Sequence, residues 1–302
     1  MDPSERELLE AAFGQSDPRR ESRDRFGTVS SVRQPDDTEE VEFLGREHRS
    51  SSEGTADPAD TGERHTTQDR RTPTEVAMTR VPSRALVLRQ GTEGLPGPRL
   101  RACFDPALSR HDALGALRTE LLLLHEGRKH SNVVPVLSAE SGEGRSQLAA
   151  ELAVCFAQLG RSTLLVDADL RSPMQHKMFN VPAQFGLAEA IEQRGKPLLH
   201  SISQLPQMYL CPAGTATQNP LNLLSEGHFM RLLSEWSRAY EFIVIDTPPA
   251  LRYADSLAVA SIVRRVLYIA RTQHTSMKAA SELLRRLEAT RADVLGAVMQ
   301  DF

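Results

Sequence analysis

The chain has 302 residues, of which 40% are hydrophobic, and carries a formal net charge of -4 at pH 7. This length accommodates one large or two ordinary domains. The slightly acidic balance gives no basic footprint for nucleic acid, so no nucleic-acid partner is expected. The three cysteines follow neither C-x-x-C nor zinc-ligand spacing, which indicates reduced thiols in a cytoplasmic protein without a metal cluster.

The first 80 residues differ in composition from the rest. They are rich in Asp, Glu, Arg, Ser and Thr and contain no Ile, Tyr or Trp, so residues 1–80 are predicted to be a disordered tail. Residues 4–13 within it have a capping box and apolar residues at helical spacing, which fits either a frayed turn or a short docking helix. The charges at the start do not suit a signal peptide, and no run approaches the roughly 18 apolar residues of a membrane-spanning helix.

Residues 81–104 are predicted to be a linker, in which residues 84–90 are either an isolated strand or part of that linker. From residue 105 onward, strand patterns alternate with helix patterns. Helices are predicted over 112–127, 145–160, 185–195, 223–240, 256–265 and 276–291, and strands over 133–139, 162–170, 207–213, 242–249, 265–272 and 295–302. This alternation predicts an α/β fold, with a mainly parallel sheet and helices on both of its faces.

The strand at 133–139 leads into a loop that nearly matches a phosphate-binding loop. Ala139-x-x-x-x-Gly144-Arg145-Ser146 has the spacing of the Walker A motif, with Arg in place of Lys. Glycines let backbone N–H groups turn inward, and the start of the following helix favours a phosphate group. Alone, the loop is equally compatible with an ordinary strand-to-helix turn. The candidate nucleotide-binding residues are Ser141, Gly142, Glu143, Gly144, Arg145, Ser146 and Gln147.

Carboxylates follow two further apolar strands. Asp167 and Asp169 are two residues apart at the end of one strand, so their side chains lean to the same side in extended backbone. Asp246 ends the apolar run at the start of segment 242–249, where a Walker B acid would hold the water shell of a metal. Either feature alone fits a solvated turn. Because the carboxyl ends of parallel strands meet at one sheet edge, their order along the chain predicts a nucleotide site of P-loop NTPase type.

These motifs resemble those of the bacterial tyrosine kinases, the P-loop autokinases of capsule and exopolysaccharide synthesis. The resemblance runs in order through residues 105–302 and includes the helix before the loop, the segment AGTATQNPLNLLSE and Asp255. It implies that residues 142–146 wrap the phosphates of ATP, and that Ser146 and Asp246 serve Mg²⁺. Asp167 would accept the proton of a tyrosine hydroxyl, and Asp169 would assist with metal or loop geometry. The implied partner is a membrane chain-length or export protein, which would recruit a cytoplasmic domain to the inner face of the membrane.

The chain departs from that family at several positions. Arg145 replaces the loop Lys, and Gln147 replaces a usual Thr. The E-x-x-R-x-x-R motif of ring assembly is reduced to Asp112, Gly115 and Arg118, so the sequence does not decide whether the chain forms a homo-oligomer. The family's acceptor tyrosines form a C-terminal cluster, whereas the four tyrosines here (Tyr209, Tyr240, Tyr253 and Tyr268) fall within the predicted fold. We therefore expect weakened or lost kinase activity and a regulatory or scaffold role.

Two alternatives remain open at this point. One is an active kinase or ATPase in which Arg145 substitutes for Lys. The other is a partitioning-type ATPase that positions cargo. The absence of an early loop Lys, where residues 140–142 read Glu-Ser-Gly, and of a basic surface signature count against the second alternative.

Overall fold

The computed structural model describes residues 30–31, 89–126, 132–215 and 217–301. The predicted helix at 4–13, nearly all of the predicted tail at 1–80, and the predicted helix cap at Gly127 lie outside the described residues. None of the helices in the described ranges has both the length and the apolar character needed to cross a membrane.

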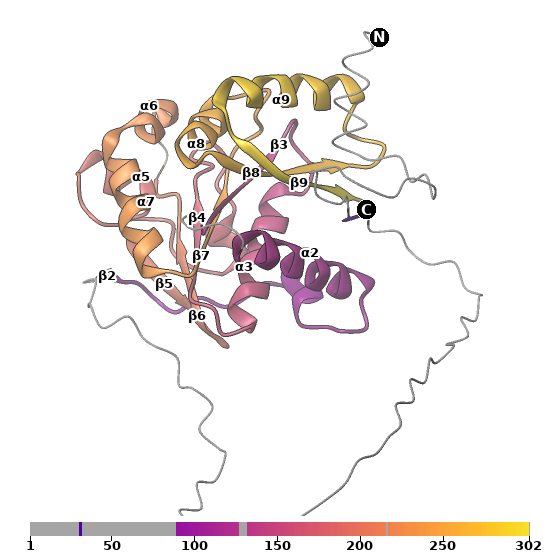
Figure 1. Cartoon of the computed structure of the whole chain (residues 1–302). Coiled ribbons are helices and arrows are strands. Elements are labelled where there is room, and N and C mark those ends of the chain that lie inside the picture. The colour runs from indigo at the N-terminus through magenta and orange to yellow at the C-terminus, as the bar shows by residue number, and fades with distance from the viewer. Residues whose placement is uncertain (1–29, 32–88, 127–131, 216, 302) are drawn as a thin grey trace, which may run out of the picture. The chain divides into compact units, whose positions relative to one another are not determined.

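A nine-stranded sheet forms the centre of the described chain, in the order β1-β9-β8-β3-β7-β4-β6-β5-β2 (Figure 1). The strands are β1 (Ser30–Ser31), β2 (Arg89–Gln90), β3 (Val133–Ser138), β4 (Thr163–Asp167), β5 (Leu198–Ile202), β6 (Leu205–Cys211), β7 (Phe242–Asp246), β8 (Arg265–Arg271) and β9 (Asp293–Gln300). Neighbouring strands are parallel except β5 and β6, which are antiparallel. The predicted mainly parallel sheet is confirmed.

Helices cover both faces of this sheet, as the alternating pattern predicts. They are the 3-10 helix η1 (Pro98–Cys103) and the helices α2 (Ser109–Glu126), α3 (Arg145–Gln158), α4 (Gln175–Met178), α5 (Leu187–Glu192), α6 (Pro220–Ser225), α7 (Gly227–Ala239), α8 (Asp255–Val263) and α9 (Met277–Thr290). One apolar cluster joins η1, α2 and α3 to one face of the sheet. A second cluster packs α5, α6 and α7 against the opposite face of the sheet. A third packs α8 and α9 against that same face (Figure 1).

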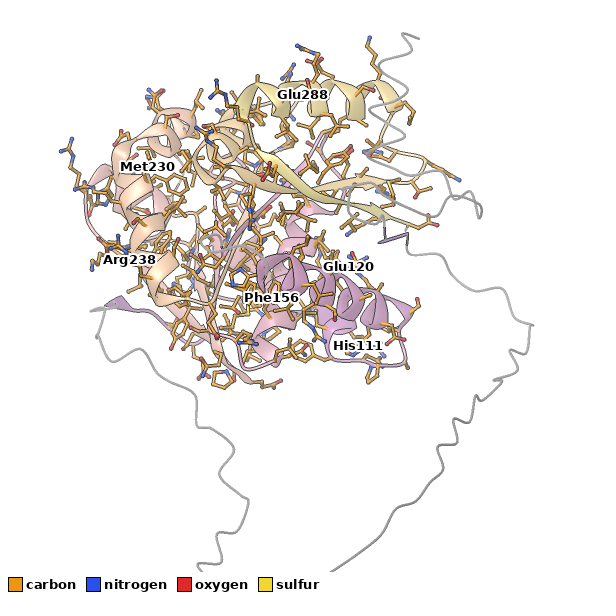
Figure 2. All side chains as sticks on the ribbon, in the orientation of Figure 1. His111, Glu120, Phe156, Met230, Arg238 and Glu288 are labelled. Carbon is orange, nitrogen blue, oxygen red and sulfur yellow. The ribbon has the colours of Figure 1, made fainter. Side chains whose placement is uncertain are left out.

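The burial of β3 explains its continuous apolar sequence. Val134 and Val136 belong to the cluster beneath α2 and α3, whereas Val133 and Leu137 belong to the clusters on the other face. Successive strand residues point to opposite faces, so a strand covered on both sides needs apolar residues throughout. Figure 2 shows Phe156 in the interior between α3 and the sheet, in contrast to the outward-facing Met230 on α7.

The structure divides one predicted helix and adds elements that the sequence did not predict. The single helix predicted over 223–240 is two helices, α6 and α7, because Glu226 between them has extended backbone with ψ of 147°. The sequence prediction also missed β1, η1, α4 and β5. Of the segment at 84–90, the two described residues form β2, which pairs with β5.

Candidate functional site

The predicted loop and the predicted acids meet at one edge of the sheet. β7 lies between β3 and β4, so the loop that follows β3 adjoins the ends of both acid-bearing strands. Asp167 and Asp246 are register partners at those ends. The topology therefore brings together the side chains that the sequence reading selected, at the carboxyl edge where ligands of such sheets bind.

Two glycines give the loop its shape. Gly142 has φ of 81° and Gly144 has φ of 82°, and this left-handed region suits a residue without a Cβ atom. Gly144 is the N-cap of α3, and no side chain in the described part of the chain caps that helix start. The first N–H groups of α3 therefore have no capping side chain, and the residues that carry them line the cavity over the loop, as in an anion site.

The other side of the loop is fastened by side chains. Arg271 donates to the carbonyl of Gly142 over 3.2 Å, and the His274 ring lies 3.0 Å from the carbonyl of Ser141. Glu143 is buried, and its carboxylate accepts hydrogen bonds from the Glu140 backbone N–H and the Thr275 hydroxyl. Glu143, predicted as a nucleotide-binding residue, thus turns its carboxylate inward and braces the loop against the turn after β8.

A cavity of about 370 Å³ lies over the loop. Its lining contains Gly142 to Gln147, which the sequence reading selected, and four residues that it missed. The missed residues are Arg99, Met174, Met178 and Arg271. Arg271 ends β8, so the rule that ligands bind at strand ends could have found it. Arg99 lies in η1, and nothing in the sequence connects it to the loop.

The Arg145 side chain turns toward the sheet edge and joins the acids. Its Nε donates to Oδ1 of Asp246 over 3.1 Å, its Nη1 to Oγ of Ser138 over 2.9 Å, and its Nη2 to Oδ2 of Asp169 over 3.0 Å. The Arg145 side chain is only 8% exposed. Burial and the charge of Asp246 raise the pKa of Asp169 above its ordinary value, and the Arg145 charge offsets part of that rise.

The Asp167 carboxylate is buried and does not lie at the protein surface. Its Oδ2 accepts the backbone N–H groups of Met174 at 3.1 Å and Gln175 at 3.0 Å, and its Oδ1 accepts that of Asp169 at 3.2 Å. It is fully buried, and this burial, followed by the nearby charge of Asp246, raises its pKa well above the ordinary value. Its role as proton acceptor stays a prediction, while its visible contacts fix the turn after β4.

Asp246 has hydrogen-bond donors on both of its oxygens. Arg145 donates to Oδ1, and Nε2 of Gln175 donates to Oδ2 over 2.8 Å. The same Gln175 nitrogen lies 2.8 Å from the carbonyl of Ser146, which ties the start of α3 to the acid. Gln175 is fully buried, and the sequence reading missed it because it lies in a four-residue helix outside every motif.

The family resemblance implies Mg²⁺ at this cluster, and the side chains as arranged do not fit it. The Arg145 guanidinium bridges Asp169 and Asp246, so a cationic group already stands between the two carboxylates. The assignment of Ser146 and Asp246 as Mg²⁺ ligands stays a prediction.

Asp255, the further position in the resemblance, anchors the loop after β4. It begins α8, is fully buried, and pairs with Arg171 through bonds of 3.1 and 3.3 Å. The Arg171 guanidinium also lies 4.1 Å from the centre of the Tyr253 ring. Asp255 therefore holds the segment that carries Asp169. Asp255 and Arg171 are far apart in the chain, and the sequence alone does not predict this contact.

The remaining departures on the helices lie in α2 and α3. Gln147 donates to Glu151 over 3.0 Å and to the carbonyl of Arg99 over 3.4 Å, so it connects α3 with η1. Asp112 is exposed, while Arg118 is half-buried.

Tyr240 and Tyr268 are buried and Tyr209 and Tyr253 are half-buried, which places all four tyrosines within the folded region.

The parallel sheet, the glycine loop and the acids at the strand ends together define a P-loop NTPase. A family model described as "ParA: NUBPL iron-transfer P-loop NTPase" matches residues 129–300, which is more than half of the chain.

Individual relatives narrow this class. The chain is 31% identical over 166 residues to the putative tyrosine-protein kinase CapB of Staphylococcus aureus, covering 54% of this chain and 72% of CapB. It is 30% identical over 193 residues to the tyrosine-protein kinase ptk of Acinetobacter johnsonii, covering 63% of this chain but only 26% of ptk. The kinase domain of the Escherichia coli tyrosine kinase ETK superposes with a TM-score of 0.60 and 26% identity, over 67% of this chain and 79% of that domain. The chain belongs to the ParA-type P-loop NTPases and, within them, to the bacterial tyrosine kinase family.

Proposed function

We propose that this chain is a pseudokinase of its family, a P-loop protein of capsule or exopolysaccharide synthesis with weakened or lost tyrosine kinase activity. The observation that carries the proposal is the destination of the Arg145 side chain. All three of its guanidinium nitrogens donate to side chains at the sheet edge, namely Asp246, Ser138 and Asp169. The residue in the position of the loop Lys is thereby engaged by the acids.

The chemistry of the two cations supports this proposal. A loop Lys is a compact charge on a flexible stem, whereas the planar guanidinium of Arg145 is matched to carboxylates in fixed directions. Phosphoryl transfer depends on alignment and charge neutralisation, and a misplacement of about 1 Å can cost about 100-fold in rate. A cation bound to Asp169 and Asp246 over 3.0 and 3.1 Å is poorly placed to follow a transferring phosphoryl group.

In this proposal the domain binds ATP or ADP and acts through association. The uncapped start of α3, the glycine turns and the cavity over the loop supply the nucleotide-binding part. The partner is a membrane chain-length or export protein of polysaccharide synthesis, as the family resemblance implies, and it recruits the chain to the inner face of the membrane.

A kinase assay tests the loss of activity. Purified chain is incubated with ATP and Mg²⁺ and a tyrosine-containing polymer, and phosphotyrosine is measured for the natural chain and for Arg145→Lys. We expect phosphotyrosine at or near background for the natural chain and a measurable gain for Arg145→Lys. The competing reading, an active kinase that uses Arg145, requires efficient transfer by the natural chain, little change in Arg145→Lys and loss in Asp167→Asn.

A further inference from the structure

The cluster around Arg145 contains a cation that belongs to the protein itself. Asp169 and Asp246 are 2% and 0% exposed, and their nearest cationic group is the guanidinium that bridges them. Two buried carboxylates without a counter-charge are costly, because desolvation and mutual repulsion both oppose their ionisation. Arg145 supplies that counter-charge, and Oγ of Ser138 accepts a hydrogen bond from its remaining nitrogen, Nη1.

Gln175 completes the cluster on the side away from Arg145. Its amide donates to Oδ2 of Asp246 and to the carbonyl of Ser146, both over 2.8 Å. The carbonyl of Ser146 and the carboxylate of Asp246 are therefore held by a protein amide at the point where the loop meets the acid. An octahedral Mg²⁺ has strict geometry and takes oxygen ligands, whereas both oxygens of Asp246 already accept hydrogen bonds from this amide and the guanidinium.

The cavity over the loop retains cationic side chains of its own. Arg99, which is exposed, and Arg271 both line it, and Arg271 also donates to the carbonyl of Gly142. The acid in the lining, Glu143, turns its carboxylate toward the Glu140 N–H beneath the loop. The opening thus presents two guanidinium groups and the uncapped start of α3 to an anion.

We propose that Arg145 permanently takes the place of the divalent cation, so that this loop binds a nucleoside diphosphate or triphosphate without Mg²⁺, with Arg99 and Arg271 neutralising the phosphates. This inference rests on the proposed function, because it takes the loop to be a nucleotide-binding loop. It goes further by making the binding independent of metal. Arg145 is a positioning residue here, and the ligand contacts fall to the loop N–H groups and to Arg99 and Arg271.

Calorimetric titration of the full chain with ADP, in EDTA and in excess magnesium chloride, tests this proposal. For the natural chain we expect the two dissociation constants to agree within about twofold. For Arg145→Lys we expect Mg²⁺ to tighten ADP binding by about tenfold or more, which corresponds to about 1.4 kcal/mol. Arg161→Lys is the matched control, because Arg161 pairs with Glu241 in an exposed position away from the loop, and it should behave as the natural chain does.

A second measurement does not depend on whether Arg145→Lys folds. Mn²⁺ is added to the natural chain with ADP, and its paramagnetic resonance signal reports any ion bound at the protein. Protein with ADP should reduce the free-ion signal no more than ADP alone does, and Arg271→Met should weaken metal-free ADP binding by about tenfold.

Three results would overturn the inference. They are a tenfold gain in natural-chain affinity with Mg²⁺, protein-dependent Mn²⁺ binding in the presence of ADP, and the absence of ADP binding in both buffers. The last result leaves the proposed loss of kinase activity standing, whereas efficient tyrosine phosphorylation by the natural chain overturns that proposal whatever the titrations show.

Discussion

Arg145 and Asp246 join the first residue of α3 to the last residue of β7, with Nε of the guanidinium 3.1 Å from Oδ1 of the carboxylate. The two residues are 101 positions apart in the chain. Their ion pair attaches the loop before α3 to the end of the sheet. The same guanidinium reaches Asp169, so the stability of the site depends on one cation shared by two acids.

We expect Arg145→Met to destabilise the chain in a pH-dependent way. At pH 8 the loss should be about 3 to 5 kcal/mol, the cost of leaving buried charges without their partner. Burial and Asp246 already raise the pKa of Asp169, and removal of Arg145 withdraws the charge that lowers it. A group with a raised folded-state pKa stabilises most when protonated, and that stability is lost as pH rises above its ordinary value. The loss should therefore be smaller at pH 5 than at pH 8.

Urea unfolding of the natural chain and Arg145→Met across this pH range measures the effect as a difference, so the contribution of Asp167 largely cancels. Arg161→Met is the control, because its partner Glu241 is 46% exposed and such surface pairs contribute less than about 1 kcal/mol. A destabilisation of Arg145→Met that stayed constant from pH 5 to pH 8 would contradict the shared-cation account.

The location of the site was predictable from the sequence, and the destination of its key side chain was not. Loop, Asp167 and Asp246 follow apolar strands, and parallel strands end at a common edge, so strand recognition was sufficient to group them. The direction taken by Arg145 depends on Ser138 and Asp169, whose positions only the assembled sheet defines.

The missed elements have similar physical causes. Gln175 lies in α4, a helix of four residues that is too short to have a periodic pattern. The strand β5 contains the fully buried His200, a polar residue at an interior position, which hides the strand pattern. The break between α6 and α7 had a signal in Gly227, since a glycine within a helical pattern weakens the prediction of one continuous helix.

Replacement of Gly142 by Ala should destabilise the chain by about 1 kcal/mol, because its φ of 81° places a Cβ atom in the unfavourable left-handed region. The nearest atom that the new Cβ would meet is Nε2 of His274 at 3.7 Å, so backbone strain is the main cost. Gly115→Ala is the matched control. It lies within α2 with no atom within 4 Å of the added Cβ, and should stabilise by about 0.5 to 1 kcal/mol. Thermal unfolding of both variants should show midpoints shifted in opposite directions, and shifts of the same sign would contradict this explanation.

A buried ion pair connects α2 with α3, and removal of only one of its two partners should lower the free energy of unfolding. Glu151 has no side-chain exposure, and Arg110 donates to it with a shortest distance of 2.6 Å. Arg110→Met should reduce the free energy of unfolding by about 3 kcal/mol or more, because Glu151 then keeps a buried charge. Arg110→Met combined with Glu151→Met should cost less than Arg110→Met alone, since the stranded charge is gone. A double-mutant cycle by urea unfolding measures this coupling, and additive effects of the two changes would show that the pair is unimportant.

The stacked pair of Phe156 and Phe242 packs the last turns of α3 against the start of β7. Their ring centres are 4.0 Å apart with an angle of 5° between the planes, and Phe156 is fully buried. Phe156→Ala should destabilise by about 3 to 5 kcal/mol through the lost contacts and the remaining cavity. Phe156→Leu keeps most of the volume and should cost less. Met230→Ala is the control, since Met230 is 51% exposed on the outer side of α7 and should change stability by less than about 0.5 kcal/mol (Figure 2). Because α3 begins at Arg145, loosening this stack should also weaken ADP binding, and a Phe156→Leu variant that loses stability without any change in ADP affinity would show that the loop is positioned independently of the core below it.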